Sequence, residues 1–260
     1  MNRDFREEIL RQLQNIEAQN NVRILFAIES GSRAWGFASP DSDFDVRFVY
    51  AHPVEWYLRV HPQRDVIELP IDADLDINGW ELRKALQLMA KCNPTLLEWL
   101  DSPIVYSDHQ ESKAQLRSLA KSFFRPVTCW HHYHSMAKTN YREYLQEDMV
   151  KLKKYLYVLR PLLACQWVEA GFGMPPMEFE ILVNRLVTQT NLQCAIQNLL
   201  EQKKQTAEAG MAPKIQVLND FIEAELIRHR DVANTLEHGE PADTTLADIF
   251  LRETVMKLSG

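Results

Sequence analysis

The chain has 260 residues, of which 46 % are apolar and 25 % charged, a composition typical of a globular protein with one large domain or two small ones. Its formal net charge of -7 argues against a general nucleic-acid coat protein. No apolar run is long enough for a membrane span, and the segment from Met1 to Leu13 is charged and amphipathic rather than a cleavable signal. We therefore expect a soluble, cytoplasmic protein without a membrane partner.

The charge is distributed unevenly. Residues 1–110 carry 11 Lys or Arg against 18 Asp or Glu, whereas residues 111–260 carry 18 of each. Within the second part, residues 113–160 hold ten basic residues and three acidic ones. An acidic half that faces a basic tract can hold a polyphosphate, although a basic tract on helices is also typical of a solvated face.

The first part alternates between helical and strand patterns. Apolar spacing predicts a helix over Arg3–Gln19, and β-branched and aromatic runs predict strands over Val22–Ile28 and Phe44–Tyr50. A third strand is expected over Asp72–Ile77, where three carboxylates alternate with apolar residues. We expect Asn78-Gly79 to end this strand.

Further elements follow this expected break. A helix is predicted over Trp80–Cys92, a second helix begins at Pro94 with Asn93 as its cap, and Pro103–Tyr106 is a candidate edge strand. Beyond residue 110 every segment with a clear pattern is helical. These predicted helices span Ser112–Phe123, Val127–Leu145, Val150–Ala170, Met177–Leu200, Lys214–Leu236 and Thr245–Leu258.

Two aspartates separated by one residue, Asp43 and Asp45, are the strongest candidate site. On a strand, residues i and i+2 point to the same face with Cα atoms roughly 7 Å apart. A third carboxylate from the strand over residues 72–77 would complete an oxygen cluster, and Asp72, Asp74 and Asp76 all share one face of it. Gathered carboxylates repel each other, so such a cluster indicates one or two divalent cations.

The aspartates follow a glycine-serine pair after a ten-residue interval. Gly31 lets the main chain approach a phosphate closely, and Ser32 offers a hydroxyl donor. A short helix opening at Arg33 would add an anion-attracting N-terminus, and Arg33 itself is a candidate triphosphate contact. A glycine-serine pair alone predicts only a turn. Followed by the two aspartates, it indicates a site for a metal-bound nucleoside triphosphate.

Two other motifs do not fit. The segment from Asp41 begins like an EF-hand calcium loop, but its sixth position is Val46 instead of Gly and its twelfth is His52 instead of Glu. The glycine region also lacks the Gly-Lys-Ser/Thr ending of a P-loop.

The pattern formed by Gly31-Ser32 and Asp43-Phe-Asp-Val46 resembles the signature of DNA polymerase β-type nucleotidyltransferases. More narrowly, four segments resemble the RlaP family, the RNA-ligase-associated polymerases, and the likeness continues through residues 133–140 and 153–160. The four segments are Glu29–Phe37, Ser42–Arg47, Asp76–Lys84 and Asn93–Glu98.

This resemblance implies an α+β fold, with a mixed-sheet catalytic domain over residues 1–110 and an all-helical domain over residues 111–260 that completes the nucleotide and acceptor cleft. It implies ligation of Mg²⁺, with Mn²⁺ as an alternative, by Asp43, Asp45 and Asp76. It also implies triphosphate contact through Gly31 and Ser32. Asp74 lies on the same predicted face, but the motif around residue 76 favours Asp76.

Weaker candidates lie on a helix of the second part. Lys153, Tyr157 and Arg160 fall at i, i+4 and i+7, so they form one stripe that could bind phosphates and stack a base. The alternative is that the tyrosine packs in the core while the cations face water. Lys138 and Asn140 are weaker candidates still.

Two further groups have local explanations. Arg47 shares a strand face with the aspartates, and we expect it to balance their charge and keep them ionised. His131 and His134 share a helix face, but no further ligand spacing supports a zinc site.

The leading hypothesis is a nucleotidyltransferase that moves a nucleoside monophosphate from a nucleoside triphosphate to an acceptor hydroxyl or phosphate. Asp43 and Asp45 would hold the metals, Asp76 would help to activate the acceptor oxygen, and Gly31 with Ser32 would orient the triphosphate. The acceptor is an RNA end, a small molecule or a protein side chain. The alternative is a non-catalytic nucleotide-binding or antitoxin-like regulator on the same fold.

Overall fold

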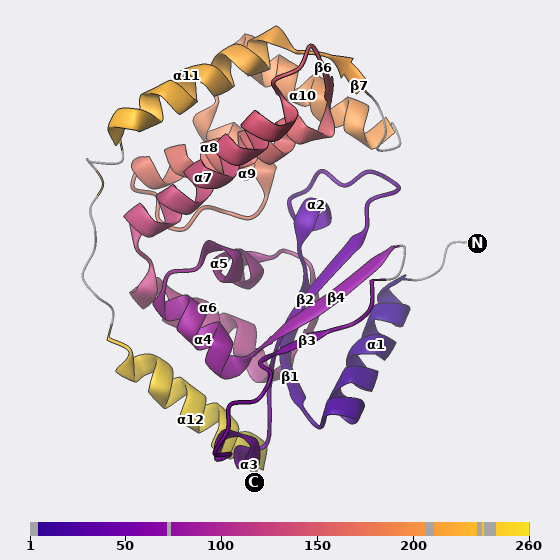
Figure 1. Ribbon diagram of the computed structural model, residues 1–260, viewed down its shortest axis with the longest axis vertical. Helices are drawn as coiled ribbons and strands as arrows, with labels where there is room; N and C mark the ends of the chain where they lie inside the picture. Colours follow the sequence, from indigo (N-terminus) through magenta and orange to yellow (C-terminus); the bar gives the residue numbers. More distant parts are fainter. Residues whose placement is uncertain (1–4, 72–73, 206–210, 233–235, 237–242, 260) are drawn as a thin grey trace. The chain divides into compact units, whose positions relative to one another are not determined.

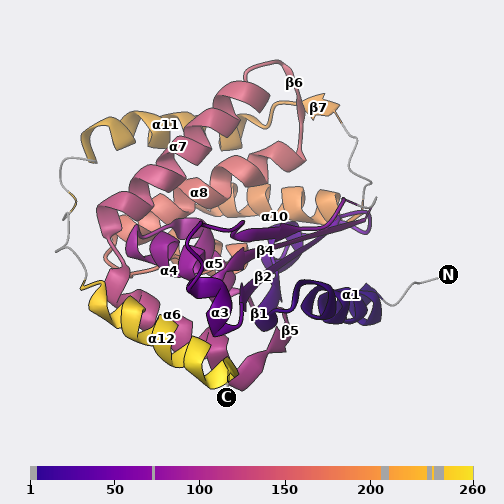
Figure 2. The same ribbon diagram turned by 60° about the horizontal axis from the view of Figure 1, so that its bottom comes forward.

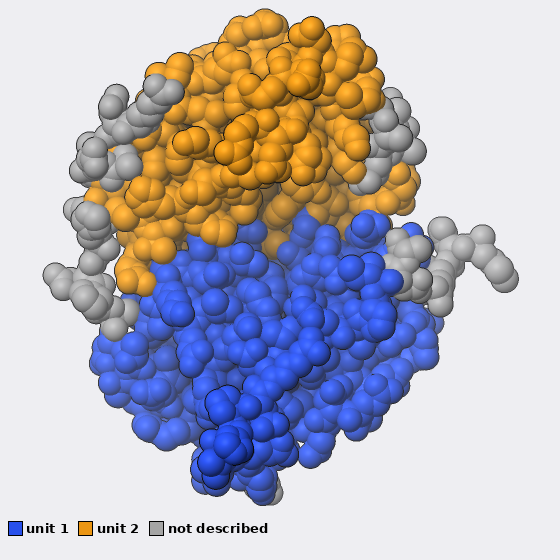
Figure 3. Space-filling model, in the orientation of Figure 1, with its two compact units in different colours: residues 1–31, 43–123, 241–260 blue, residues 32–42, 124–240 orange. Residues whose placement is uncertain are grey.

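The computed structural model describes residues 5–71, 74–205, 211–232, 236 and 243–259 (Figures 1 and 2). The chain forms two compact units (Figure 3). Unit 1 comprises residues 1–31, 43–123 and 241–260, and unit 2 comprises residues 32–42 and 124–240. The segment between the glycine and the aspartates of the candidate site thus belongs to the second unit.

Unit 1 is built on a five-stranded mixed sheet with the order β3-β4-β2-β1-β5. Only β2 and β4 pair in parallel, and the other neighbours are antiparallel. The interior strand β1, which lies between β2 and β5, buries every residue except its first, because both of its faces are covered. The strands are β1 (Arg23–Glu29), β2 (Phe44–Ala51), β3 (Val66–Glu68), β4 (Leu75–Glu81) and β5 (Val105–Asp108).

Helices cover the sheet on both faces (Figure 1). Helix α1 (Phe5–Asn20) packs its apolar stripe against the sheet face that carries Val46 and Ile77. Because side chains alternate along a strand, Asp45 and Arg47 point to the opposite face. Unit 1 also contains α3 (Val54–Tyr57), α4 (Leu82–Ala90), α5 (Pro94–Asp101), the 3-10 turn η1 (His109–Glu111), α6 (Ser112–Ala120), the 3-10 turn η2 (Lys121–Phe123) and α12 (Thr245–Ser259).

The predicted end of the third strand is wrong. β4 runs through Asn78 and Gly79 to Glu81, and α4 begins only at Leu82. Gly79 lies beneath the ring of Phe48, where a Cβ atom would come within 2.2 Å of the ring. The glycine therefore serves close packing between neighbouring strands rather than a turn. The predicted cap of the next helix is confirmed, since the Asn93 side chain accepts a hydrogen bond from the Leu96 N–H at 3.1 Å.

Unit 2 is mainly helical. Its longer helices are α7 (Pro126–Tyr144), α8 (Lys153–Glu169), α9 (Phe179–Leu186), α10 (Thr190–Gln205) and α11 (Gln216–Val232). The helix expected over 177–200 is two helices, which the extended Val187 separates. A small antiparallel sheet of β6 (Met149–Lys151) and β7 (Met211–Pro213) was not predicted, because runs of three residues leave too short a periodic pattern.

The core of unit 2 includes the aromatic residues of segment 32–42. Phe37 is buried among side chains of α7 to α11, and the half-buried Trp35 packs against the same cluster. The Phe179 N–H donates to the Trp35 carbonyl at 3.0 Å. Packing of these aromatic side chains, rather than position in the sequence, therefore places the segment in unit 2.

The fold class predicted from the sequence is confirmed: the chain is α+β, with a mixed sheet, flanking helices and a mainly helical remainder. The compact units divide the chain differently from a boundary at residue 110. α6 packs on α5 and β1, and α12 packs on α3 and α4, so both join unit 1. The division into a catalytic domain over residues 1–110 and a helical domain over residues 111–260 stays a prediction. Within the described ranges, no helix is both long enough and apolar enough to cross a membrane.

Candidate active site

Asp45 and Asp76 lie side by side on the parallel strands β2 and β4, where they are register partners. Their side chains are 31 % and 30 % exposed, so solvent and ligands reach both carboxylates. Asp43 is exposed and comes immediately before β2, which begins at Phe44. Pairing between β2 and β4 thus joins two carboxylates that are 31 residues apart in the sequence.

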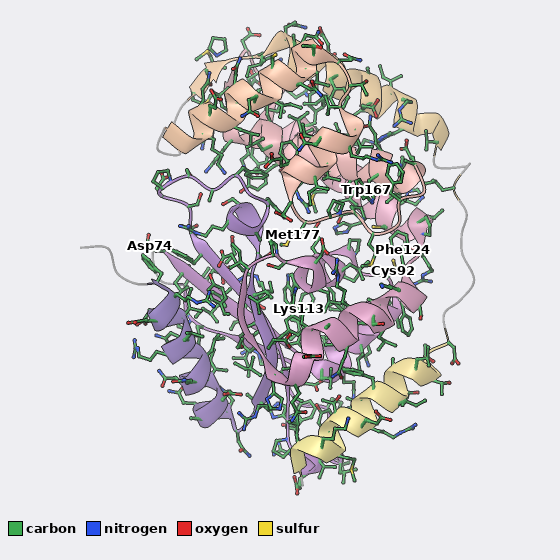
Figure 4. The ribbon with its side chains drawn as sticks, turned by 180° about the vertical axis from the view of Figure 1, so that it is seen from behind. Asp74, Cys92, Lys113, Phe124, Trp167 and Met177 are labelled. Carbon is green, nitrogen blue, oxygen red and sulfur yellow. The ribbon has the colours of Figure 1, made fainter. Side chains whose placement is uncertain are left out.

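Asp74 occupies a different position from Asp76. It is exposed and precedes β4 (Figure 4), and its main-chain carbonyl accepts the Phe44 N–H at 2.8 Å. The register therefore favours Asp76 over Asp74 as the partner of Asp45. Asp72 lies outside the described residues.

Arg47 bridges the paired carboxylates. Its Nη2 donates to Asp45 Oδ1 at 3.0 Å and to Asp76 Oδ2 at 2.7 Å, and its Nη1 donates to the Asp76 carbonyl at 3.0 Å. The arginine side chain is only 16 % exposed. Its positive charge offsets the repulsion between the two carboxylates, as we expected of a residue on this strand face.

The donors of this cluster fit a divalent cation. Carboxylate oxygens are the ligands that Mg²⁺ and Mn²⁺ prefer, and Mg²⁺ commonly needs only one or two of them because it keeps several waters. In the part of the chain that the structure describes, no three His, Cys, Asp or Glu side chains gather closely enough to hold a metal by themselves. Metal ligation by Asp43, Asp45 and Asp76 stays a prediction.

Gly31 lies directly against Asp45. It has a φ of +57°, and a Cβ atom there would lie 2.0 Å from Asp45 Oδ2 and 2.9 Å from its Cγ. No side chain fits in that space, and the left-handed conformation also favours glycine. Close approach of the main chain was expected at this residue, but the group that it approaches is the aspartate carboxylate.

Two contacts hold the main chain of Asp45. The Asp45 N–H donates to Glu29 Oε1 at 2.8 Å, and the Ser30 N–H donates to the Asp45 carbonyl at 2.8 Å. Glu29 is fully buried, and its Oε2 accepts a hydrogen bond from the Tyr106 hydroxyl. Neither Glu29 nor Tyr106 was predicted from the sequence as a functional residue. The available signal was a carboxylate at the end of an otherwise apolar strand.

Ser32 and Arg33 belong to unit 2 and to the short helix α2 (Gly31–Ala34). Ser32 is buried, and its carbonyl accepts the Phe37 N–H at 3.0 Å. Arg33 Nη2 donates to the Ser42 carbonyl at 2.5 Å, so the guanidinium joins the two ends of segment 32–42. Their contact with a triphosphate stays a prediction.

The stripe predicted on α8 is only partly accessible. Lys153 and Tyr157 are half-buried, and the Tyr157 ring makes an edge contact with Trp35 at 5.6 Å. Arg160 is 1 % exposed, stacks over Trp35 at 4.8 Å and donates its Nε to the Met177 carbonyl at 3.2 Å. A guanidinium packed in this way is not available to a ligand, so the expectation that Arg160 binds nucleotide does not agree with its burial. Its contacts instead support segment 32–42.

The histidine pair on α7 has a partner on α11. His134 Nδ1 lies 3.0 Å from His229 Nδ1, and the His134 ring stacks on Trp130. His229 Nε2 also lies 3.4 Å from Glu169 Oε1. Burial lowers the pKa of His229 to about 4, against the opposing effect of Glu169. These contacts describe an internal polar cluster of unit 2.

Comparisons with known proteins identify the family of this chain. The model of the RlaP family, described as the RNA repair pathway DNA polymerase beta family, matches residues 5–253. A protein of Bacillus subtilis strain 168, the uncharacterized protein YcgL, is 46 % identical over 251 residues, which are 96 % of each chain.

A solved structure gives a weaker likeness. It is a nucleotidyltransferase-like protein from Exiguobacterium sibiricum 255-15, and it aligns with 96 % of this chain and 80 % of its own at 11 % identity. The TM-score of 0.32 is too low to support an argument.

Proposed function

The chain belongs to the RlaP family, the RNA repair pathway DNA polymerase beta family, and from this premise we propose that it is a metal-dependent nucleotidyltransferase. An acceptor oxygen attacks the α-phosphorus of a nucleoside triphosphate. One O–P bond forms, the bond from the α-phosphorus to its bridging oxygen breaks, the acceptor oxygen loses its proton, and pyrophosphate leaves. Such transfer depends mainly on positioning and on charge stabilisation.

The observation that carries the proposal is the grouping around Asp45. Its carboxylate lies beside that of Asp76 through strand pairing and against the main chain of Gly31. Anionic metal donors next to a main chain without a side chain suit a metal-bound polyphosphate. Two carboxylates side by side on neighbouring strands repel each other, and a bound cation relieves this repulsion.

The roles follow from this grouping. Asp43 and Asp45 would hold Mg²⁺ or Mn²⁺, and Asp76 would help to activate the acceptor oxygen. Bound metal supplies the positive charge that stabilises the transferring phosphoryl group. Gly31 leaves room for the phosphates, and Ser32 with Arg33 offers donors to them. Arg47 balances the negative charge of Asp45 and Asp76 and holds the two carboxylates in place.

We propose an RNA end as the acceptor, because the description of the family places it in RNA repair. A small molecule or a protein side chain remains an outcome of the test. A screen of the four nucleoside triphosphates against RNA ends, with mass detection of the added group, distinguishes these acceptors.

The proposal is tested by pyrophosphate release with Mg²⁺ or Mn²⁺ in the wild type and in single variants. Asp45→Ala and Asp76→Ala should lower kcat by at least ~100-fold, because each removes a charge that acts on the transition state. Asp74→Ala is the matched control, since it removes an exposed aspartate two residues away, and it should retain activity. Equal activity in all variants would remove the assignment.

One observation favours the rival, a non-catalytic nucleotide-binding regulator. The contacts from Arg47 balance the charge of Asp45 and Asp76 without a metal. Tight binding of nucleotide with no turnover under any acceptor would support this rival.

A further inference from the structure

Glu29 is a buried acidic residue at the end of an otherwise apolar run. It ends β1, its side chain is 0 % exposed, and the five residues before it in the strand are buried and apolar. Burying a carboxylate is costly unless hydrogen bonds compensate for lost water. Here the compensating donors include the Asp45 N–H at 2.8 Å and the Tyr106 hydroxyl at 2.5 Å.

The contact with Asp45 lies where the strand ladder ends. The register between β1 and β2 stops at the pair of Glu29 and Val46, and Ser30 then donates its N–H to the Asp45 carbonyl. The chain turns away at Gly31, which has a positive φ. The Glu29 side chain takes the place of a main-chain acceptor at this point, so the Asp45 N–H stays paired although the ladder has ended.

Glu29 is itself held by the segment that leads into β5, the neighbour of β1 on the edge away from β2. Its N–H donates to the Ile104 carbonyl at 3.0 Å, and its carbonyl accepts the Ser102 hydroxyl at 2.6 Å. The Ser102 carbonyl in turn accepts a hydrogen bond from the ammonium group of Lys113 (Figure 4). The residue that holds Asp45 is therefore fixed by both its main chain and its side chain.

We propose that Glu29 is a positioning residue for Asp45. It fixes the main chain of the aspartate so that the carboxylate lies against Gly31 and beside Asp76. Glu29 is fully buried and does not itself touch metal or nucleotide. The inference rests on the proposed function, because it assigns Glu29 a role through the candidate metal ligand.

Two substitutions separate the hydrogen bond from the volume of the side chain. Glu29→Leu keeps a similar volume but removes the acceptor for the Asp45 N–H. Glu29→Gln keeps a carbonyl oxygen for this N–H, and its amide can donate to the Tyr106 hydroxyl. We expect the leucine variant to bind Mn²⁺ about 10–100-fold more weakly, as loss of a partner behind a metal ligand commonly does. The glutamine variant should stay close to the wild type.

Glu81 provides the matched control. It is also a buried glutamate of unit 1 that accepts a tyrosine hydroxyl, from Tyr57 at 2.5 Å, but it caps α4 instead of holding Asp45. Glu81→Leu should lower the melting temperature without changing Mn²⁺ affinity.

Three measurements decide the inference. Mn²⁺ binding followed by electron paramagnetic resonance needs no turnover, amide exchange at residue 45 reports the hydrogen bond directly, and pyrophosphate release gives kcat and KM. In Glu29→Leu we expect faster exchange at residue 45 and a kcat lower by ~100-fold, as for a misplacement of about 1 Å. The KM for the triphosphate should change little, because Gly31 and Ser32 remain.

The outcomes also separate this inference from the proposed function. An active wild type with unchanged Mn²⁺ affinity and kcat in Glu29→Leu would overturn the positioning role, even if the melting temperature fell. A wild type that neither binds Mn²⁺ nor releases pyrophosphate would refute the proposed function. If amide exchange at residue 45 were also unchanged in Glu29→Leu, the hydrogen bond from the Asp45 N–H to Glu29 would not hold the main chain of Asp45, and the positioning role would be refuted as well.

Discussion

Gly31→Ala tests the contact between the glycine and Asp45 directly. The residue has a φ of +57°, and the added Cβ would lie 2.0 Å from Asp45 Oδ2. Ordinary van der Waals contact begins at 3.4 Å, so the carboxylate has to move by about 1.4 Å or the turn has to open. Either change displaces the candidate metal ligand.

Two separate costs follow from the structure. A left-handed conformation costs an L-residue about 1–2 kcal/mol, which for a chain of this size lowers the melting temperature by roughly 2–8 °C. Displacement of the carboxylate by more than 1 Å acts on catalysis instead and should lower kcat by ~100-fold or more. The assays are thermal unfolding and pyrophosphate release.

Gly171→Ala is the control for the backbone cost. Gly171 has a φ of +72°, but a Cβ there would meet nothing within 4 Å. It should therefore lose stability by a similar amount and keep its activity. If the two variants have the same kcat, the close approach between Gly31 and Asp45 does not matter for the reaction, and our reasoning about the site is refuted.

Three further variants test other parts of the structure. Arg47→Met leaves the two bridged aspartates to repel each other, so we expect the metal-free protein to lose about 1–3 kcal/mol of stability and to recover most of it with Mg²⁺, measured by thermal unfolding. Gly79→Ala places a Cβ within 2.2 Å of the Phe48 ring and should cost about 1–3 kcal/mol in urea unfolding. Because the pKa of His229 is lowered from 6.5 to about 4 in the folded chain, the unfolded chain binds more protons between these values. Stability should therefore fall as the pH drops from about 6.5 towards 4, and His229→Gln should show a smaller fall.

Each of these expectations has a result that contradicts it. An Arg47→Met protein whose stability does not respond to Mg²⁺ would argue against metal binding by Asp45 and Asp76. Wild-type stability in Gly79→Ala would mean that β2 and β4 are not packed as described. Parallel pH profiles for the wild type and His229→Gln would show that another group, such as the half-buried His52, dominates the acid response.

Much of the candidate site followed from local patterns. The β-branched and aromatic pattern located β2, which contains Asp45 and begins directly after Asp43, helical periodicity located α1, and the capping preference of asparagine located α5. Such features depend on residues within a few positions of one another, because one turn or one strand face is set by the adjacent backbone.

Tertiary structure decided the rest. Whether Asp74 or Asp76 lies beside Asp45 depends on the register of two strands that are distant in sequence, because a slip of two residues would exchange these aspartates without changing the face. The same pairing turned Gly79 from an expected turn residue into a packing position. The role of Glu29 also arises only in three dimensions, because an acceptor for the Asp45 N–H is needed where the ladder ends. The sequence by itself determined which chemical groups the site contains, and strand pairing determined which of them meet, because hydrogen bonds between distant strands leave no periodic signal in either strand.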